Sequence, residues 1–234
     1  MLMTSKFFVL RPLAIVDLPA PGNPVRHTIS LATLKHLSNK LREIIIKIRL
    51  EKNGMRTFVA AEISNESVLN TITKIQSELD IDARPVSKQN MHFTLLFLGE
   101  ISEEVSKRVQ EALTTVEFSP IPINFTGVGV FPNAKFPRVL WVGINEDAAA
   151  SLSELAKKVE ATLAPLGFTS DKPFSPHVTI FRVKRRAGNI SKELEKFKDY
   201  KIGDDTISEI KFKKSTLTPD GPIYSDLQVV IAKK

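Results

Sequence analysis

The feature of this sequence that most constrains its fold is a helix-then-strand pattern that occurs twice. In each copy an amphipathic helix ends about a dozen residues before a histidine that opens a strand. The first histidine segment is residues 90–95 (NMHFTL) and the second is residues 175–180 (SPHVTI). The repeat indicates an internal duplication with pseudo-two-fold symmetry, an arrangement that commonly places equivalent sheet edges across one cleft.

Apolar periodicity predicts the elements of residues 55–234. Alternating apolar residues indicate strands, and apolar residues three and four apart indicate helices. The predicted strands are 56–63, 91–98, 121–130, 138–144, 177–183, 207–217 and 223–231, and the predicted helices are 65–79, 102–115, 147–165 and 191–199. We therefore predict an α+β, bilobal fold of two pseudo-symmetric halves. Each half has a mostly antiparallel sheet with helices outside, and the active-site cleft lies between them.

Residues 1–54 differ from the rest of the chain in charge. They hold nine Lys or Arg residues against three acids, a net charge of +6, whereas the other 180 residues carry a net charge of only +1. A basic amphipathic helix within 31–52 that binds a membrane surface or RNA is one interpretation. We favour an extension outside the fold that arises from an upstream start, because Met55 opens a strand-like segment that makes a natural beginning. We expect residues 55–234 to fold and act without it.

Composition excludes several classes of protein. The chain has no cysteine, so it has no disulfide framework and no thiolate metal site. Its longest early apolar run, residues 7–10, is far too short for a signal peptide or a membrane span. From these features we expect a cytoplasmic, monomeric protein with no membrane contact and no evident protein partner.

The histidine segments carry the chemistry. His92 and His177 are the only histidines in residues 55–234, and each is followed two residues later by a threonine, Thr94 or Thr179. Because residues two apart on a strand share a face, each histidine points the same way as its threonine. Two imidazoles that meet in one cleft can supply both an acid and a base near neutral pH.

These motifs resemble those of the 2H phosphoesterase superfamily, and within it the RNA 2′,3′-cyclic phosphodiesterases, the LigT-like or 2′-5′ RNA ligase family. The resemblance extends over residues 55–234. Beyond the motifs it rests on residues 56–60, 131–133, 137–143, 215–217 and 221–224. It implies hydrolysis of RNA 2′,3′-cyclic phosphate ends to 2′-phosphates without metal or cofactor. Cleaved tRNA halves are one candidate RNA, and the reverse 2′-5′ ligation is open to the same site.

The resemblance also implies roles for individual residues. His92 is the proton donor, His177 the proton acceptor, and Thr94 and Thr179 bind the phosphate. Arg182 stands where the family uses a phosphate-binding arginine, although strict alternation places it on the face opposite His177. It reaches the phosphate only if the strand twists, bulges or ends near Phe181. Alternatively, it faces solvent within the basic run 182–186.

Two further functions remain open. One is a non-catalytic RNA or nucleotide-binding module of the same fold, and the other is a phosphodiesterase that acts on a small cyclic nucleotide. Of the aromatic residues in the segments that carry the resemblance (Phe58, Phe131, Trp141 and Tyr224), one could stack on a terminal base. We expect Trp141 to lie in the core, because it stands between Leu140 and Val142.

Overall fold

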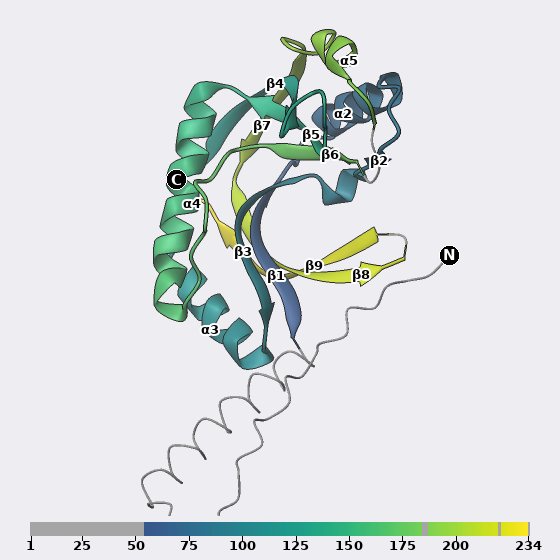
Figure 1. Ribbon diagram of the computed structural model, residues 1–234. Coiled ribbons are helices and arrows are strands. Elements are labelled where there is room, and N and C mark those ends of the chain that lie inside the picture. The colour runs from purple at the N-terminus through teal and green to yellow at the C-terminus, as the bar shows by residue number, and fades with distance from the viewer. Residues whose placement is uncertain (1–53, 184–186, 220, 234) are drawn as a thin grey trace, which may run out of the picture. The chain divides into compact units, whose positions relative to one another are not determined.

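The computed structural model describes residues 54–183, 187–219 and 221–233, so the predicted extension lies almost wholly outside the described residues. Two antiparallel sheets form the described part of the chain (Figure 1). The first sheet has the order β3-β1-β8-β9, with β1 Met55–Glu62, β3 His92–Ile101, β8 Glu209–Thr218 and β9 Gly221–Ile231. The second has the order β2-β6-β5-β4-β7, with β2 Arg84–Pro85, β4 Ile121–Phe131, β5 Val139–Ile144, β6 Val178–Arg182 and β7 Lys201–Ile207. The predicted α+β architecture of two antiparallel halves is confirmed.

The helices start where the sequence predicts them. They are α2 Glu66–Glu78, α3 Glu103–Leu113, α4 Glu146–Leu163 and the short α5 Ser191–Glu195, with 3-10 turns η1 Lys88–Asn90 and η2 Ala164–Leu166. Asn65 caps α2 by accepting a hydrogen bond of 2.9 Å from the Ser67 amide. Ser102 caps α3 in the same way, by accepting from the Val105 amide at 3.2 Å. Both caps satisfy amides that a helix leaves unpaired at its first turn.

The two sheets do not coincide with the two sequence halves. The C-terminal hairpin of β8 and β9 pairs with β1 and completes the first sheet. The two-residue strand β2, which lies between β1 and β3 in sequence, pairs instead with β6 of the second sheet. The predicted strand 207–217 corresponds to β8, whereas β7, which the sequence did not indicate, belongs to the second sheet. Segments from both halves therefore meet at the junction of the sheets.

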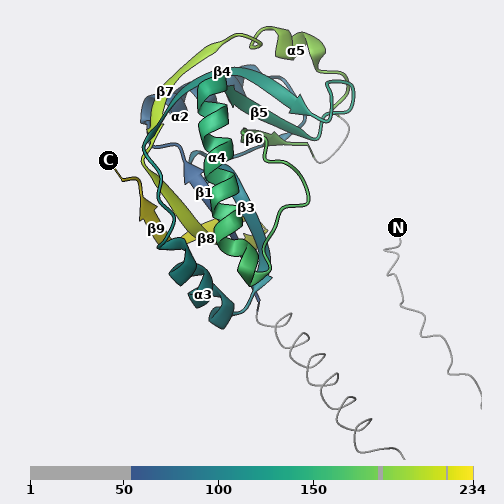
Figure 2. The ribbon, with the colours of Figure 1, turned by 90° about the vertical axis from the view of Figure 1, so that its left-hand side faces the viewer.

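Helices tie the sheets together. Helix α2 follows β1 of the first sheet but packs on β6 and β7 of the second. Helix α4 contacts both β3 and β4, and Figure 2 shows it running across the two sheets. The rings of Phe93 on β3 and Phe125 on β4 stack with centroids 5.9 Å apart, so one hydrophobic core joins the sheets.

Each motif strand carries a β-bulge at the residue after its threonine. On β3, Thr94 pairs with Ala60 and Leu96 with Val59, so Leu95 is the extra residue. On β6, Thr179 pairs with Trp141 and Phe181 with Leu140, so Ile180 is the extra residue. A bulge reverses the alternation of faces beyond it. The internal duplication thus extends to an irregularity of the backbone.

The described residues include no helix that is both long enough and apolar enough to cross a bilayer.

Candidate active site

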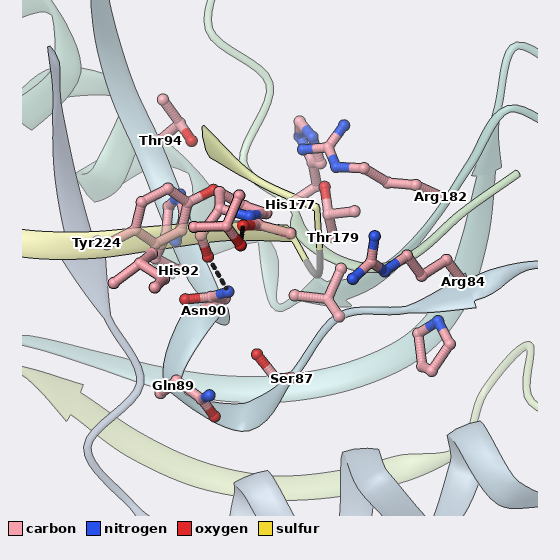
Figure 3. A pocket seen from close by; sticks show the side chains of 16 residues that line it. Arg84, Ser87, Gln89, Asn90, His92, Thr94, His177, Thr179, Arg182 and Tyr224 are labelled. Atoms are coloured by element: carbon pink, nitrogen blue, oxygen red, sulfur yellow. Dashed lines mark hydrogen bonds between the residues drawn. The ribbon is translucent and has the colours of Figure 1, made fainter. Parts of the chain in front are cut away.

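One pocket of about 570 Å³ contains both motifs (Figure 3). His92 and Thr94 reach it from β3 of the first sheet, and His177 and Thr179 from the start of β6 in the second. The remaining wall comes from the segment before β3 and from the β8–β9 hairpin. The lining residues are Arg84, Pro85, Val86, Ser87, Gln89, Asn90, His92, Thr94, His177, Thr179, Arg182, Thr218, Gly221, Pro222, Ile223 and Tyr224.

His92 is enclosed by aromatic rings. Phe58 on β1 stacks on its imidazole at a centroid distance of 5.0 Å, and Tyr224 on β9 meets it edge-on at 5.4 Å. Its Nδ1 is buried and makes no hydrogen bond of ordinary geometry with a described residue, although the Asn90 backbone two residues earlier favours the protonated ring. Burial lowers the pKa of His92 from 6.5 to about 4, because the protonated ring loses its hydration. The neutral imidazole is therefore the dominant form in the free site at neutral pH.

His177 is held differently. Its Nδ1 lies 2.7 Å from the carbonyl oxygen of Ser175. A carbonyl can only accept, so Nδ1 carries the proton, and in the neutral ring the lone pair is on Nε2. Phe131 contacts the ring edge-on at 5.2 Å. The site thus presents a fixed proton-accepting nitrogen on one side.

Arg182 shares the pocket face with Thr179 because of the bulge. Beyond Ile180 the register continues with Phe181 opposite Leu140 and Arg182 opposite Val139. Ile180 and Phe181 are both buried, whereas Arg182 is exposed and lines the pocket. The bulge is the departure from strict alternation that an arginine at this position needs. Arg182 is therefore exposed and faces the same cavity as both motifs.

A cluster of charges lies beside His92 on the first sheet. Glu62 is the cross-strand partner of His92. Lys211 Nζ lies 2.6 Å from Glu62 Oε2, and Lys213 contacts both Glu62 and Asp226. Lys213 is 4% exposed, so its charge is compensated almost entirely within the protein. Burial would raise the pKa of Glu62, but the two lysines outweigh it and lower that pKa below 4.5.

The sequence interpretation missed several residues of the pocket. Arg84 and Asn90 line it, and Glu62 lies beside it, whereas Tyr224, one of the predicted stacking candidates, also lines it. Asn90 Nδ2 donates 3.1 Å to the Pro222 carbonyl and so joins the segment before β3 to the C-terminal hairpin. The run Arg84 to Asn90 leads directly into the first motif, which is the signal that could have suggested Arg84 and Asn90.

The expectation for Trp141 is wrong. Leu140 and Val142 are fully buried, but Trp141 between them is only partly buried and pairs with Thr179 on the motif face. Its ring lies edge-on to His177 at 6.5 Å, and it covers Gly129 so closely that a Cβ there would be 2.1 Å from the indole. Alternation itself requires this outcome, because a residue between two core residues of a strand points away from the core.

Within the described residues, no group of three or more His, Cys, Asp or Glu side chains is arranged to hold a metal ion.

Comparison with known proteins gives a consistent family. The sequence model of the LigT like Phosphoesterase family matches twice, over residues 63–141 and 142–224. Each match contains one His-x-Thr motif, which agrees with the duplication. Among curated relatives, the RNA 2′,3′-cyclic phosphodiesterase of Archaeoglobus fulgidus is 41% identical over 177 residues, covering 75% of this chain and 99% of the relative. The enzyme of the same name from Methanocaldococcus jannaschii is 36% identical, covering 73% and 96% respectively.

Solved structures give the same answer for the fold. The crystal structure of E. coli LigT complexed with 3′-AMP aligns with a TM-score of 0.66 at 23% identity, covering 78% of this chain and 100% of that one. The crystal structure of a Thermus thermophilus protein aligns with a TM-score of 0.63 at 28% identity, covering 76% and 97%. With two family matches, relatives more than 30% identical over nearly their whole length, and the same fold, this chain belongs to the LigT-like phosphoesterase family.

Proposed function

We propose that this protein hydrolyses 2′,3′-cyclic phosphate ends of RNA to 2′-phosphates. The observation that carries the proposal is the meeting of two His-x-Thr motifs in one pocket. The names of the relatives support the substrate class. Both motifs belong to residues 55–234 of a single chain, so a monomer contains every residue that the reaction uses.

His177 acts as the base. With its Nδ1 proton directed to Ser175, Nε2 is free to accept a proton from water. The water oxygen then attacks phosphorus as its proton passes to Nε2. The hydrogen bond to Ser175 also fixes the orientation of the ring, which a general base needs.

His92 acts as the acid on the other side. The P–O3′ bond breaks, and O3′ takes a proton from His92, which leaves a free 3′-hydroxyl and a 2′-phosphate. In the free site His92 is neutral, because burial, together with the charges of Lys213 and Arg182, disfavours the imidazolium. A bound phosphodiester brings a negative charge that raises the pKa of this histidine. The acid role requires that bound substrate raise this pKa far enough to protonate the ring.

Thr94, Thr179 and Arg182 stabilise the phosphate. The two hydroxyls can donate to the non-bridging oxygens, and the guanidinium offers a planar fork of donors that matches them. Charge on these oxygens grows as the pentacoordinate state forms, so donors already in place lower the barrier. No step in this scheme requires a metal ion or a cofactor.

The test is a product assay in the presence of EDTA. A short RNA that ends in a 2′,3′-cyclic phosphate is incubated with the protein, and the product is identified by mass and by 2′ or 3′ regiochemistry. We expect a 2′-phosphate, which is absent with a His177→Ala variant. A 3′-phosphate, or activity that EDTA removes, would contradict the mechanism. Binding of the RNA end without turnover would favour the non-catalytic binding module.

Ligation is tested with the same protein. An RNA with a cyclic phosphate end and a second RNA with a 5′-hydroxyl are mixed, and a 2′-5′ linked product is sought by gel and by resistance to a 3′-5′-specific nuclease. We expect a small yield, because the 5′-hydroxyl must take the place of water as the nucleophile while the P–O3′ bond breaks and O3′ takes a proton, and water competes with it. Loss of ligation without loss of hydrolysis in a single variant would contradict a shared site.

A further inference from the structure

Arg84 is a second guanidinium in the pocket that the hydrolytic scheme does not use. It lies on β2 and is the cross-strand partner of Arg182 on β6. Directly paired residues of an antiparallel ladder point to the same face. Figure 3 shows both side chains extending into the pocket toward the two histidines. Two arginines on adjacent strands thus serve one cavity, although the scheme requires only one for the cyclic phosphate.

The backbone that carries Arg84 is fixed from two sides. The Val86 amide donates 2.8 Å to the Ile180 carbonyl, at the bulge of β6. Gln76 of α2 donates from Nε2 to the carbonyls of Val86 and Ile180, at 2.9 and 2.8 Å. One side-chain amide therefore clamps the end of β2 to the motif strand. A strand of two residues would be weak without such support, and the clamp holds Arg84 at a set position relative to Thr179.

Within the pocket, the guanidinium of Arg84 lies against the start of β9 in the C-terminal hairpin. A Cβ placed on Gly221 would be 3.0 Å from Arg84 Nη2 and 3.5 Å from its Cζ. Gly221 also has a φ of 130°, so both its backbone and the space beside it favour glycine. Arg84 thus occupies the hairpin side of the cavity, while Arg182 lies with the motif of the second sheet.

We propose that Arg84 binds the phosphodiester on the 5′ side of the terminal nucleotide, so that the site favours an RNA end over a nucleoside cyclic phosphate. This inference rests on the proposed function. An RNA end offers one cyclic phosphate, a ribose, a base and the phosphate at the 5′ oxygen. The cyclic phosphate is taken by the threonines and Arg182, and the remaining anion is the group that a guanidinium fork binds best.

A merely structural role for Arg84 makes a different prediction. If the side chain only holds β2 against the hairpin, its loss weakens every ligand alike. If it binds the 5′ phosphate, its loss acts on ligands that carry that phosphate. The two roles are therefore distinguished by the ratio of kcat/KM for a substrate with a 5′-phosphate to that for the same substrate without it. The activity toward one substrate does not distinguish them.

The experiment compares two substrates and three proteins. Cytidine 2′,3′-cyclic phosphate is hydrolysed with and without a 5′-phosphate, by wild type, Arg84→Ala and Arg108→Ala. Arg108 is an exposed arginine on α3 that does not line the pocket, and it is the matched control. We expect the 5′-phosphate to raise kcat/KM at least ~10-fold in wild type and in Arg108→Ala, because hydrogen bonds to charged groups are strong. In Arg84→Ala the gain falls below ~3-fold.

Equilibrium binding separates failure of this inference from failure of the proposed hydrolysis. Adenosine 3′-monophosphate and adenosine 3′,5′-bisphosphate are titrated against the same proteins by calorimetry. A wild-type preference for the bisphosphate that Arg84→Ala removes supports the inference even where no turnover is seen. No preference in wild type, or a preference that Arg84→Ala leaves intact, overturns it. If Arg84→Ala unfolds, Arg84→Lys keeps the charge without the fork and should retain only part of the gain.

Discussion

Strands β3 and β6 share a backbone design, yet their histidines lie in different surroundings. Each strand has a motif histidine at its start and a bulge one residue after the motif threonine. His92 stacks on Phe58 and has a pKa that burial lowers to about 4, whereas His177 donates from Nδ1 to the Ser175 carbonyl and meets Phe131 edge-on. The two halves place their histidines at equivalent backbone positions. The residues that contact each imidazole give it a different chemical environment.

The position three residues after each threonine shows the same divergence. It is Phe97 on β3 and Arg182 on β6, and both bulges turn it toward the motif face. Phe97 is 68% exposed and packs only loosely on Phe58, at 6.1 Å between centroids, whereas Arg182 lines the pocket. One scaffold therefore presents a cation on the side of His177, the proposed base, and an aromatic ring on the side of His92, the proposed acid. The site is symmetric in backbone and asymmetric in chemistry.

The largest effect is expected when each histidine is replaced in turn, because both imidazoles take part in the proposed reaction. His92→Ala and His177→Ala should each lower kcat at least ~10²-fold, the usual contribution of general acid–base catalysis. Steady-state hydrolysis of a cyclic phosphate end is the measurement. Retention of near wild-type turnover by either variant would show that the two halves do not divide the acid and base roles.

The burial of His92 should make the free energy of unfolding depend on pH. Its pKa is about 4 in the folded state against 6.5 for an ordinary histidine, so only the unfolded chain takes up this proton between those values. The contribution of neutral His92 to the free energy of unfolding is therefore complete above pH 6.5. It is lost as the pH falls toward 4, by about 3 kcal/mol in total. Urea unfolding from pH 7 to 4 should show this loss in wild type. The difference between wild type and His92→Phe isolates it from other acid groups, and a constant difference would contradict the burial.

Replacement of Arg182 and of Phe97, which stand at equivalent positions, should have different effects on activity. Arg182→Ala should lower kcat/KM by roughly 10- to 100-fold, because it removes charged hydrogen bonds to the phosphate. Phe97→Ala should change it by less than ~3-fold, since this exposed ring has no place in the proposed chemistry. Matched kinetics on one cyclic substrate decide the point. Equal losses in both variants would mean that the aromatic position also contacts substrate.

A smaller effect than that of Arg182→Ala is expected for Glu62→Gln. The Glu62 carboxylate favours protonated His92, so its removal lowers the pKa of that histidine further. The alkaline limb of the kcat profile should move to lower pH by less than about one unit, with a few-fold loss at pH 7. A pH–rate profile separates this shift from a general loss of activity. Movement of the limb to higher pH would contradict the assigned role of the acid.

The duplicated motif allowed most of the architecture and the centre of the site to be predicted. Two copies of His-x-Thr at strand starts, after similar helices, led to two antiparallel sheets and one shared pocket. Asn65 and Ser102 likewise mark helix starts through local hydrogen bonds that depend on a few neighbouring residues. What is encoded within a few residues of the chain can be found from the sequence alone.

The remaining parts of the site depend on pairings between distant segments. The bulge at Ile180, which directs Arg182 into the pocket, is visible only in the register of β5 and β6. Glu62 meets Lys211 and Lys213 across strands about 150 residues apart in sequence. Arg84 enters the pocket because β2 leaves its own half and pairs with β6. No local sequence pattern predicts these contacts, because they depend on which distant strands pair in each sheet.

The most direct test of the central claim is an NMR titration of His92 and His177, with and without adenosine 3′-monophosphate. We predict that His92 titrates near a pKa of about 4 in the free protein and at a higher pKa in the complex, and that neutral His177 carries its proton on Nδ1. A free-state pKa near 6.5 for His92 that the ligand leaves unchanged, or an Nε2-protonated His177, would contradict the division of acid and base between the halves.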